Sequence, residues 1–171
     1  SGEALAERVR DALTVGDARS FDQDPRFGLI VLGEIGQRAL SAAVNDPGTA
    51  IDVMNRLVRV LIDAQRADDD GAATPSAAEA PRHDRVTLVP LDEAALVYDA
   101  FEPLSRDGAG LIEVGIRMQK LLGMLAMGSR SGAVARAARR QAETACEQAL
   151  AALKHAPDRE ALKAQCVAPQ I

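Results

Sequence analysis

Two Asp-Pro dipeptides constrain the fold of this chain more than any other local feature. Asp24-Pro25 and Asp46-Pro47 lie 22 residues apart, and apolar residues follow each of them at intervals of three and four. An aspartate side chain accepts hydrogen bonds from the free amides at the start of a helix, and proline at the first helical position loses no needed donor. The pattern predicts two helices, over 25–43 and 47–64, joined by a tight turn into a helical hairpin.

The composition favours helices in the rest of the chain as well. Hydrophobic residues make up 47% of the 171 residues but aromatic residues only 2%, so alanine, leucine and valine must fill most of the core. Close-packed helices suit such a core better than a sheet, because strands favour β-branched and aromatic side chains. We therefore expect a mainly all-α helical bundle built from helical hairpins. Its further helices are predicted over 3–14, 92–105, 111–127 and 131–155, with a short last helix from Pro157.

The order of these segments predicts a single helical domain over 1–171. Residues 66–84 are acidic, rich in alanine and proline, and lack large apolar side chains, which is typical of a flexible linker or surface loop. The predicted linker separates two helical halves, 3–65 and 85–167. Residues 85–90 alternate like a short strand, and their only expected partner is the segment 12–15.

Apolar runs in this chain are too short to cross a membrane. A spanning helix needs roughly 18–20 continuous apolar residues, and the longest apolar stretch, 111–127, is interrupted by Glu113, Arg117 and Lys120. We expect that stretch to be the central buried helix. The chain begins with Ser1-Gly2 and has no signal peptide, so it is expected to be a soluble piece of a longer protein.

Charge is distributed unevenly along the chain. The net charge is −5, but residues 1–114 carry 21 acidic and 11 basic side chains, whereas residues 115–171 carry 4 and 9. The basic C-terminal part either complements the acidic part of the same domain or meets anionic lipid head groups or an acidic partner. Nucleic acid is not an expected partner, because the pI is about 5.1 and aromatic residues are not interleaved with the basic ones.

The two cysteines, Cys146 and Cys166, are too few for a disulfide framework. A helical hairpin that turns near Ala156 would place them at matched depths. We expect two unpaired thiols, with a bridge between them as the alternative. Neither cysteine has the spacing of a metal ligand, so neither a metal nor another cofactor is expected.

Polar residues are densest between positions 17 and 52, where no standard catalytic motif occurs. The first interpretation is structural: caps and salt bridges, including a Glu34–Arg38 ion pair, hold the helical hairpin together. The alternative is a polar pocket for a small ligand or a cation, with Asp24, Asn45 and Asp46 as oxygen donors. The candidate ligand-binding residues are Arg19, Asp24, Arg38, Ser41, Asn45, Asp46 and Thr49.

The same region, residues 21–57, resembles the signature of domain-of-unknown-function family 2254, a family of predicted bacterial membrane proteins. The matching motifs are Gln23-Asp24-Pro25, Phe27-Gly28, Arg38-Ala39-Leu40-Ser41, Asn45-Asp46-Pro47 and Thr49-Ala50. The chain departs from the pattern at Ala42, where the family usually has proline, and at Asn55, next to a position where aspartate is common. The resemblance implies membrane spans N-terminal to a soluble region, in a family without an established activity.

Together these features predict a non-catalytic interaction or regulatory domain of a bacterial inner-membrane protein. The cytoplasmic face is favoured because nothing indicates an oxidised, disulfide-built fold. The expected partners are the membrane spans of the parent protein, a second copy of the chain and anionic lipid head groups. One alternative is the ligand- or ion-sensing part of a transport or channel component that uses the Asp24, Arg38, Asn45 and Asp46 cluster. Another is a hydrolase with Asp24 and Asp46 as paired carboxylates.

Overall fold

Helices make up all the regular structure in the part of the chain that the computed structural model describes, which is residues 2–12, 16, 17, 19, 21, 24–71 and 91–166. This confirms the expected all-α fold. The helices are α1 (Gly2–Asp11), α2 (Pro25–Leu40), α3 (Pro47–Gly71), α4 (Glu93–Asp107), α5 (Ile112–Gly128), α6 (Gly132–Ala152) and α7 (Ala156–Lys163). The predicted strand segments, 85–90 and most of 12–15, lie outside the described residues.

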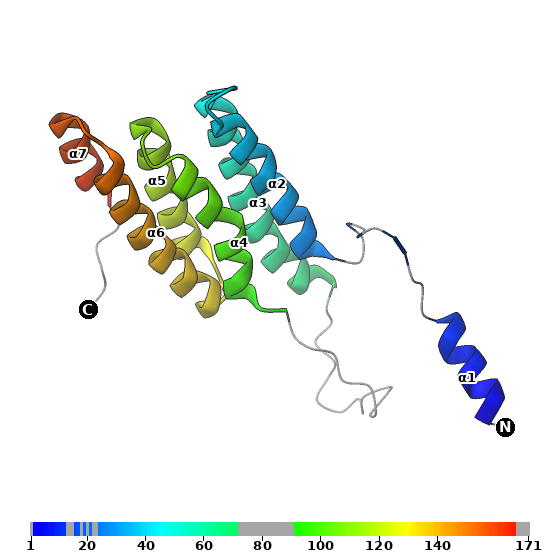
Figure 1. Ribbon diagram of the computed structural model, residues 1–171. Helices are drawn as coiled ribbons and strands as arrows, with labels where there is room; N and C mark the ends of the chain where they lie inside the picture. Colours follow the sequence, from blue (N-terminus) through cyan, green and yellow to red (C-terminus); the bar gives the residue numbers. More distant parts are fainter. Residues whose placement is uncertain are drawn as a thin grey trace.

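The bundle has two layers of helices. In Figure 1, α2, α4 and α6 lie side by side, with α3 and α5 behind them. The contacts agree: α4 packs between α2 and α6, while α5 packs against α3 and α6. Helix α7 packs against α5 and α6, and α1 contacts none of the other described helices. As a result α3 and α5 lie next to each other, although α4 separates them in the sequence.

A continuous apolar core joins α2 to α6. Its largest fully buried side chains come from α3, α4 and α5 and include Met54, Leu57, Phe101, Leu104 and Leu122. The predicted central helix is α5, which buries residues along most of its length. A second, smaller cluster of Ala149, Leu153 and Leu162 holds α7 against the bundle.

Local sequence chemistry explains where most of these helices begin. Side-chain oxygens accept hydrogen bonds from the first backbone amides of each capped helix, which satisfies donors that have no partner inside the helix. These caps are Asp24 for α2, Asp46 for α3, Asp92 for α4 and Ser131 for α6. The two hairpin caps expected from Asp-Pro are therefore confirmed.

Close packing of α2 against α4 depends on Gly36, whereas a Cβ at Gly33 would make ordinary van der Waals contact. A Cβ atom at Gly36 would lie 2.7 Å from Cδ2 of Leu104, and one at Gly33 would lie 3.7 Å from the backbone oxygen of Asp99. Only a residue without a side chain fits at Gly36 unless Leu104 moves. Gly28 instead faces Phe21, 3.7 Å from where its Cβ would lie.

The boundary of the predicted linker is wrong at its start. Helix α3 continues to Gly71, so residues 66–71, the first six of the predicted linker, are helical. Residues 66–70 contain neither proline nor glycine, so nothing in them stops the helix before Gly71. The rest of the predicted linker, 72–84, lies outside the described residues. At the other end of the hairpin, α2 ends at Leu40, three residues before its expected end.

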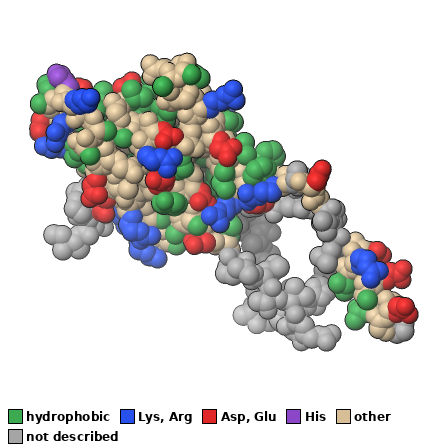
Figure 2. Space-filling view, in the orientation of Figure 1, with side chains coloured by type: hydrophobic (Ala, Val, Ile, Leu, Met, Phe, Trp, Pro, Cys, Tyr) green, Lys and Arg blue, Asp and Glu red, His purple; other side chains and the backbone are tan. Residues whose placement is uncertain are grey.

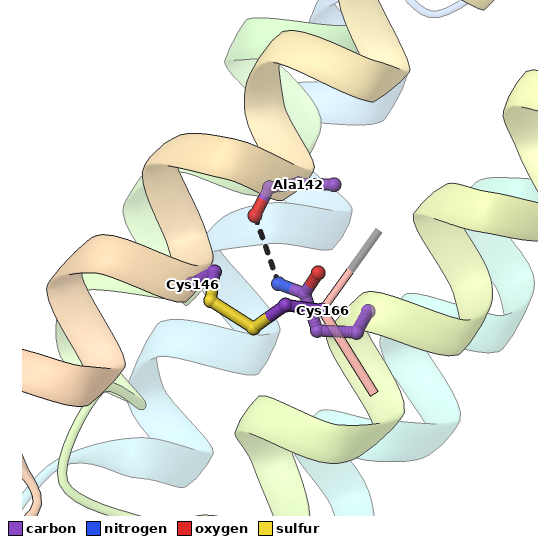
Figure 3. The surroundings of a disulfide bond; sticks show 4 residues. Ala142, Cys146 and Cys166 are labelled. Carbon is purple, nitrogen blue, oxygen red and sulfur yellow. Dashed lines mark hydrogen bonds between the residues drawn. A yellow bond between two sulfur atoms is a disulfide. The ribbon is translucent and has the colours of Figure 1, made fainter. Parts of the chain in front are cut away.

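The two cysteines are bonded, which corrects the expectation of unpaired thiols. Cys146 of α6 and Cys166, just beyond α7, form a disulfide with their Cα atoms 6.0 Å apart (Figure 3). The expected turn near Ala156 does bring them to the same depth. What the sequence reasoning lacked was the short turn after Lys163, which directs Cys166 back toward α6.

Candidate functional site

The first group of predicted site residues lies at the start of α2. Nε of Arg19 donates a hydrogen bond to Oδ2 of Asp24 at 2.9 Å, and the Arg19 guanidinium lies 4.8 Å from the ring centre of Phe27. Asp24 also accepts the backbone N–H of Phe27 at 3.0 Å. The Arg19 side chain, followed by this backbone hydrogen bond, lowers the pKa of Asp24. Asp24 is therefore a charged cap whose oxygens already have donors.

The second group lies in the turn between α2 and α3. Asp46 accepts hydrogen bonds from the Thr49 hydroxyl at 2.6 Å and from the Thr49 backbone N–H at 3.0 Å. These two bonds, the hydroxyl first, lower the pKa of Asp46. The Ser41 hydroxyl donates to the backbone oxygen of Arg38 at 2.7 Å, and Asn45 adopts a left-handed φ of 47°. The side chains of Ser41, Asp46 and Thr49 therefore hold the turn and the start of α3.

These two groups do not form one pocket. Helix α2 has 16 residues, which corresponds to a length of about 24 Å, and Asp24 lies before its first residue whereas Asp46 lies beyond its last. The proposed oxygen donors Asp24, Asn45 and Asp46 therefore lie at opposite ends of a helix, too far apart for a shared ligand or a pair of catalytic carboxylates. The expected Glu34–Arg38 ion pair is also absent from the described residues.

Acid should weaken the α3 cap. The pKa of Asp46 is lower in the folded state than its unfolded value of about 3.9, so its carboxylate stabilises the fold above that value. This contribution is lost as the pH falls below the unfolded value and through the folded one. Asp46→Asn keeps an oxygen acceptor but does not titrate. Between neutral and acidic pH, the melting temperature of the Asp46→Asn variant should fall less than that of the unmodified chain. An equal fall in the two proteins would contradict the assignment of Asp46 as a charged cap.

Sequence reasoning missed a groove between α3 and α5. The groove has a volume of about 620 Å³ and lies open to solvent. Apolar side chains, including Ile62 and Leu121, form part of its wall. Its charged lining consists of Arg56, Arg59, Arg66, Arg117, Asp52 and Asp63. The α3–α5 groove therefore has an excess of positive charge on a chain whose net charge is −5.

Arg117 reaches across the α3–α5 groove to a neutral acceptor. Its Nε donates to Oδ1 of Asn55 at 3.1 Å, and its Nη2 donates to the same oxygen. Arg66 pairs with Asp63 at 3.3 Å, but both side chains are more than half exposed, where such pairs contribute little. Neither Arg56 nor Arg59 forms an ion pair with another described residue.

Two arginines of the opposite layer do have carboxylate partners. On the face formed by α2, α4 and α6, basic and acidic side chains are interspersed (Figure 2). Arg26 pairs with Asp99, which raises the pKa of the Arg26 guanidinium. Arg106 donates to Asp107 at 3.1 Å and lies 3.6 Å from a carboxylate oxygen of Glu102. Arg26 and Arg106 thus have carboxylate partners among the described residues, whereas Arg56 and Arg59 in the α3–α5 groove have none.

The side chain of Gln65 joins the two walls of the α3–α5 groove where α5 ends. Oε1 of Gln65, on α3, accepts the Ser129 hydroxyl at 2.7 Å, the Arg130 backbone N–H at 2.9 Å and the Ser131 backbone N–H at 3.1 Å. Its Nε2 donates to the Leu61 backbone oxygen at 2.7 Å. Gln65 therefore ties α3 to the turn that follows α5, which fixes the two walls relative to each other.

A signal for this groove exists in the sequence. Polar residues recur on α3 at Asp52, Arg56, Arg59 and Asp63, at the spacing of one helical face. Arg117 looked like an interruption of an apolar run. The polar residues of α3 and Arg117 of α5 form one site because α3 and α5 lie side by side in the fold. The sequence alone does not reveal that these two helices are neighbours.

The geometry thus defines a helical domain with a basic groove and with two capping clusters. In the described part of the chain, no helix is both long and apolar enough to cross a membrane. The model of the family described as "Predicted membrane protein", domain of unknown function 2254, matches residues 1–124. The chain therefore belongs to this family, as the motifs in residues 21–57 suggested. The matched segment includes both walls of the α3–α5 groove.

Curated relatives have no assigned activity. Uncharacterized proteins of Mycobacterium bovis and Mycobacterium tuberculosis are 39% identical to this chain over 79 residues, which is 46% of the chain. That match spans 15% of the length of each relative, so most of those proteins lies outside the compared region. No solved structure matches the chain.

Proposed function

We propose that this domain is a non-catalytic interaction module with which a membrane protein binds an anionic partner in the α3–α5 groove. The observation that carries the proposal is a pair of arginines, Arg56 and Arg59, that form no ion pair with a described carboxylate. They lie beside a third arginine, Arg117, whose partner is neutral. Exposed arginines in a concave surface raise the local concentration of anions and select them over cations.

The ionisation of the carboxyl groups supports a role without catalysis. The pKa values of Asp24, Asp46 and Glu160 are lowered, and in each case a hydrogen bond to a neighbouring side chain is the largest cause. These carboxyl groups therefore stay charged at neutral pH. A general acid or base works best when its pKa lies near the working pH, and these shifts move away from it.

The alternative function, ligand or ion sensing by the Asp24, Arg38, Asn45 and Asp46 cluster, has less support. Asp24 and Asp46 lie at opposite ends of α2, and each carboxylate already accepts hydrogen bonds from its own turn. Binding of one ion by both would require α2 to unfold. The α3–α5 groove needs no such rearrangement.

Poly-glutamate binding to the 171-residue chain at low salt tests the proposal. The double variant Arg56→Glu/Arg59→Glu reverses two charges in the α3–α5 groove and should weaken binding roughly tenfold or more. Its matched control is Arg136→Glu/Arg140→Glu, which reverses two exposed charges on α6. Fluorescence polarisation of a labelled peptide gives both affinities. An equal loss in the two variants would assign binding to net charge and would contradict the groove.

We extend the proposal to the side of the membrane. The sequence favoured the cytoplasmic face because it offered no sign of disulfide formation, and the Cys146–Cys166 bond removes that reason. Disulfides persist in oxidising compartments and are rare in the cytosol. We therefore propose that the domain lies on the face of the membrane away from the cytosol. The oxidation state of these two cysteines in cells decides the point.

A further inference from the structure

We infer that the α3–α5 groove is a phosphate site centred on Arg117, with Asn55 keeping that arginine oriented but not neutralised. The inference rests on the proposed function and adds the chemical class of the ligand. Four observations carry it: a neutral partner for Arg117, two arginines on the adjacent helix that pair with no described carboxylate, an apolar wall, and a volume suited to a small ligand.

The neutral partner is the most specific of these features. A guanidinium has five N–H donors, and Arg117 uses two of its nitrogens on one oxygen of Asn55. An amide oxygen fixes the direction of the side chain, as a carboxylate would, but brings no negative charge. Donors of the partly buried Arg117 are therefore left for an incoming anion, and its charge has no counterion among the described residues.

The neighbouring arginines enlarge this charge. Arg56 and Arg59 lie one turn apart on α3 and line the same groove as Arg117 on α5. The planar fork of a guanidinium matches the oxygens of phosphate in bidentate fashion. A phosphate group has enough oxygens to accept from two or three such forks at once, whereas one carboxylate satisfies about one. This arrangement favours phosphate over a carboxylate ligand.

The acidic residues of the groove do not cancel the site. Asp63 already pairs with Arg66, at the end of the groove distant from Asn55. Asp52 lies on the preceding turn of α3 and forms no ion pair with a described residue. The Asp52 carboxylate repels an anion at its own end of the groove. This repulsion confines the phosphate to the stretch that faces Arg117.

The apolar wall indicates more than inorganic phosphate. Ile62, Leu121 and Met124 line the groove, and Met124 is 51% exposed. The volume of about 620 Å³ lies within the roughly 300–1,000 Å³ of ordinary small-ligand sites. The ligand is therefore a phosphate ester with a less polar portion. Its phosphate comes either from a soluble ester or from the head group of an anionic phospholipid.

A single charge placed at residue 55 tests the inference. Asn55→Asp keeps the size of the side chain but supplies Arg117 with an internal counterion, so pyrophosphate binding should weaken roughly tenfold or more. The only other asparagine of the chain is Asn45. Asn45→Asp makes the same charge change in the turn between α2 and α3, and it should leave the pyrophosphate affinity within about twofold. Both variants are made in the 171-residue chain and titrated calorimetrically, and circular dichroism checks that each is folded.

NMR gives a second readout that does not depend on the Asn55 variant. The Arg117 Nε–H resonance should shift and saturate with pyrophosphate, and Arg117→Lys should weaken binding because lysine lacks the bidentate fork. Equal pyrophosphate affinity of Asn55→Asp and Asn45→Asp would overturn the inference. So would the absence of saturable binding of every phosphate probe.

Two further arms identify the source of the phosphate. Glycerol 3-phosphate represents soluble esters, and phosphatidylcholine vesicles with or without phosphatidic acid represent the head group. Binding that is sensitive to Asn55→Asp in either arm supports the site and names its source. If poly-glutamate binds through Arg56 and Arg59 while no phosphate probe binds, the inference fails and the proposed function stands. If neither binds, both fail.

Discussion

Truncating Phe101 to alanine should destabilise the domain by about 3–5 kcal/mol. Phe101 is 0% exposed and is the only fully buried aromatic side chain in the described part of the chain. Its removal leaves a cavity that the surrounding alanine and leucine side chains of the packed helices fill only partly. Because domains are stable by roughly 5–15 kcal/mol in total, this is the largest effect expected of a single substitution here.

The matched control lies one turn earlier on the same helix. Tyr98 is 59% exposed, so Tyr98→Ala removes an aromatic ring from α4 without opening a cavity. Urea denaturation of the two variants should give a loss for Phe101→Ala that is several times the loss for Tyr98→Ala. Similar losses would mean that Phe101 does not occupy the core position described above.

Removing the disulfide should cost about 3 kcal/mol of stability. The bond closes a loop with a sequence separation of 20 residues, and loop-closure entropy in the unfolded chain gives a stabilisation of about this size. The double variant Cys146→Ser/Cys166→Ser should unfold at lower denaturant concentration, and the parent chain should match it after reduction. The variant itself should not respond to the reductant. Because a small apolar cluster then holds α7 against the bundle, the amides of α7 should lose protection from hydrogen exchange first.

The same two cysteines can be followed in cells. Alkylation of free thiols before lysis, followed by mass spectrometry, should find Cys146 and Cys166 protected in the parent membrane protein. Quantitative alkylation of both would contradict the proposed side of the membrane, and it would return the domain to the cytoplasmic face that the sequence favoured. The stability loss on reduction in vitro does not depend on that outcome.

The helix caps and the helical periodicity, which depend on residues close together in the sequence, were predictable from the sequence. Asp24 and Asp46 cap their helices because each carboxylate accepts a free backbone amide and the proline that follows suits the first helical position. The apolar periodicity after each aspartate indicates one buried helical face. The all-α architecture followed from an interior with almost no aromatic residues. The cap and periodicity predictions concern residues fewer than about five positions apart, where local propensity and hydrogen bonding decide the structure.

Features that depend on how distant helices pack were not predictable. The Arg117–Asn55 contact joins residues 62 positions apart, and it exists because α4 lies in the other layer and leaves α3 beside α5. The same packing decides which arginines find carboxylates and which do not. The polar residues of the first hairpin looked like one cluster in the sequence, but the straight helix between them keeps Asp24 and Asp46 apart.

The Gln65 junction has a consequence for how the groove responds to its surroundings. All four of its hydrogen bonds involve uncharged groups, so the junction between α3 and the end of α5 neither titrates nor weakens by ionic screening. Changes of pH or ionic strength then act on the occupant of the groove and leave the spacing of its walls unchanged. An anionic occupant would therefore meet walls whose spacing stays the same as ionic conditions vary.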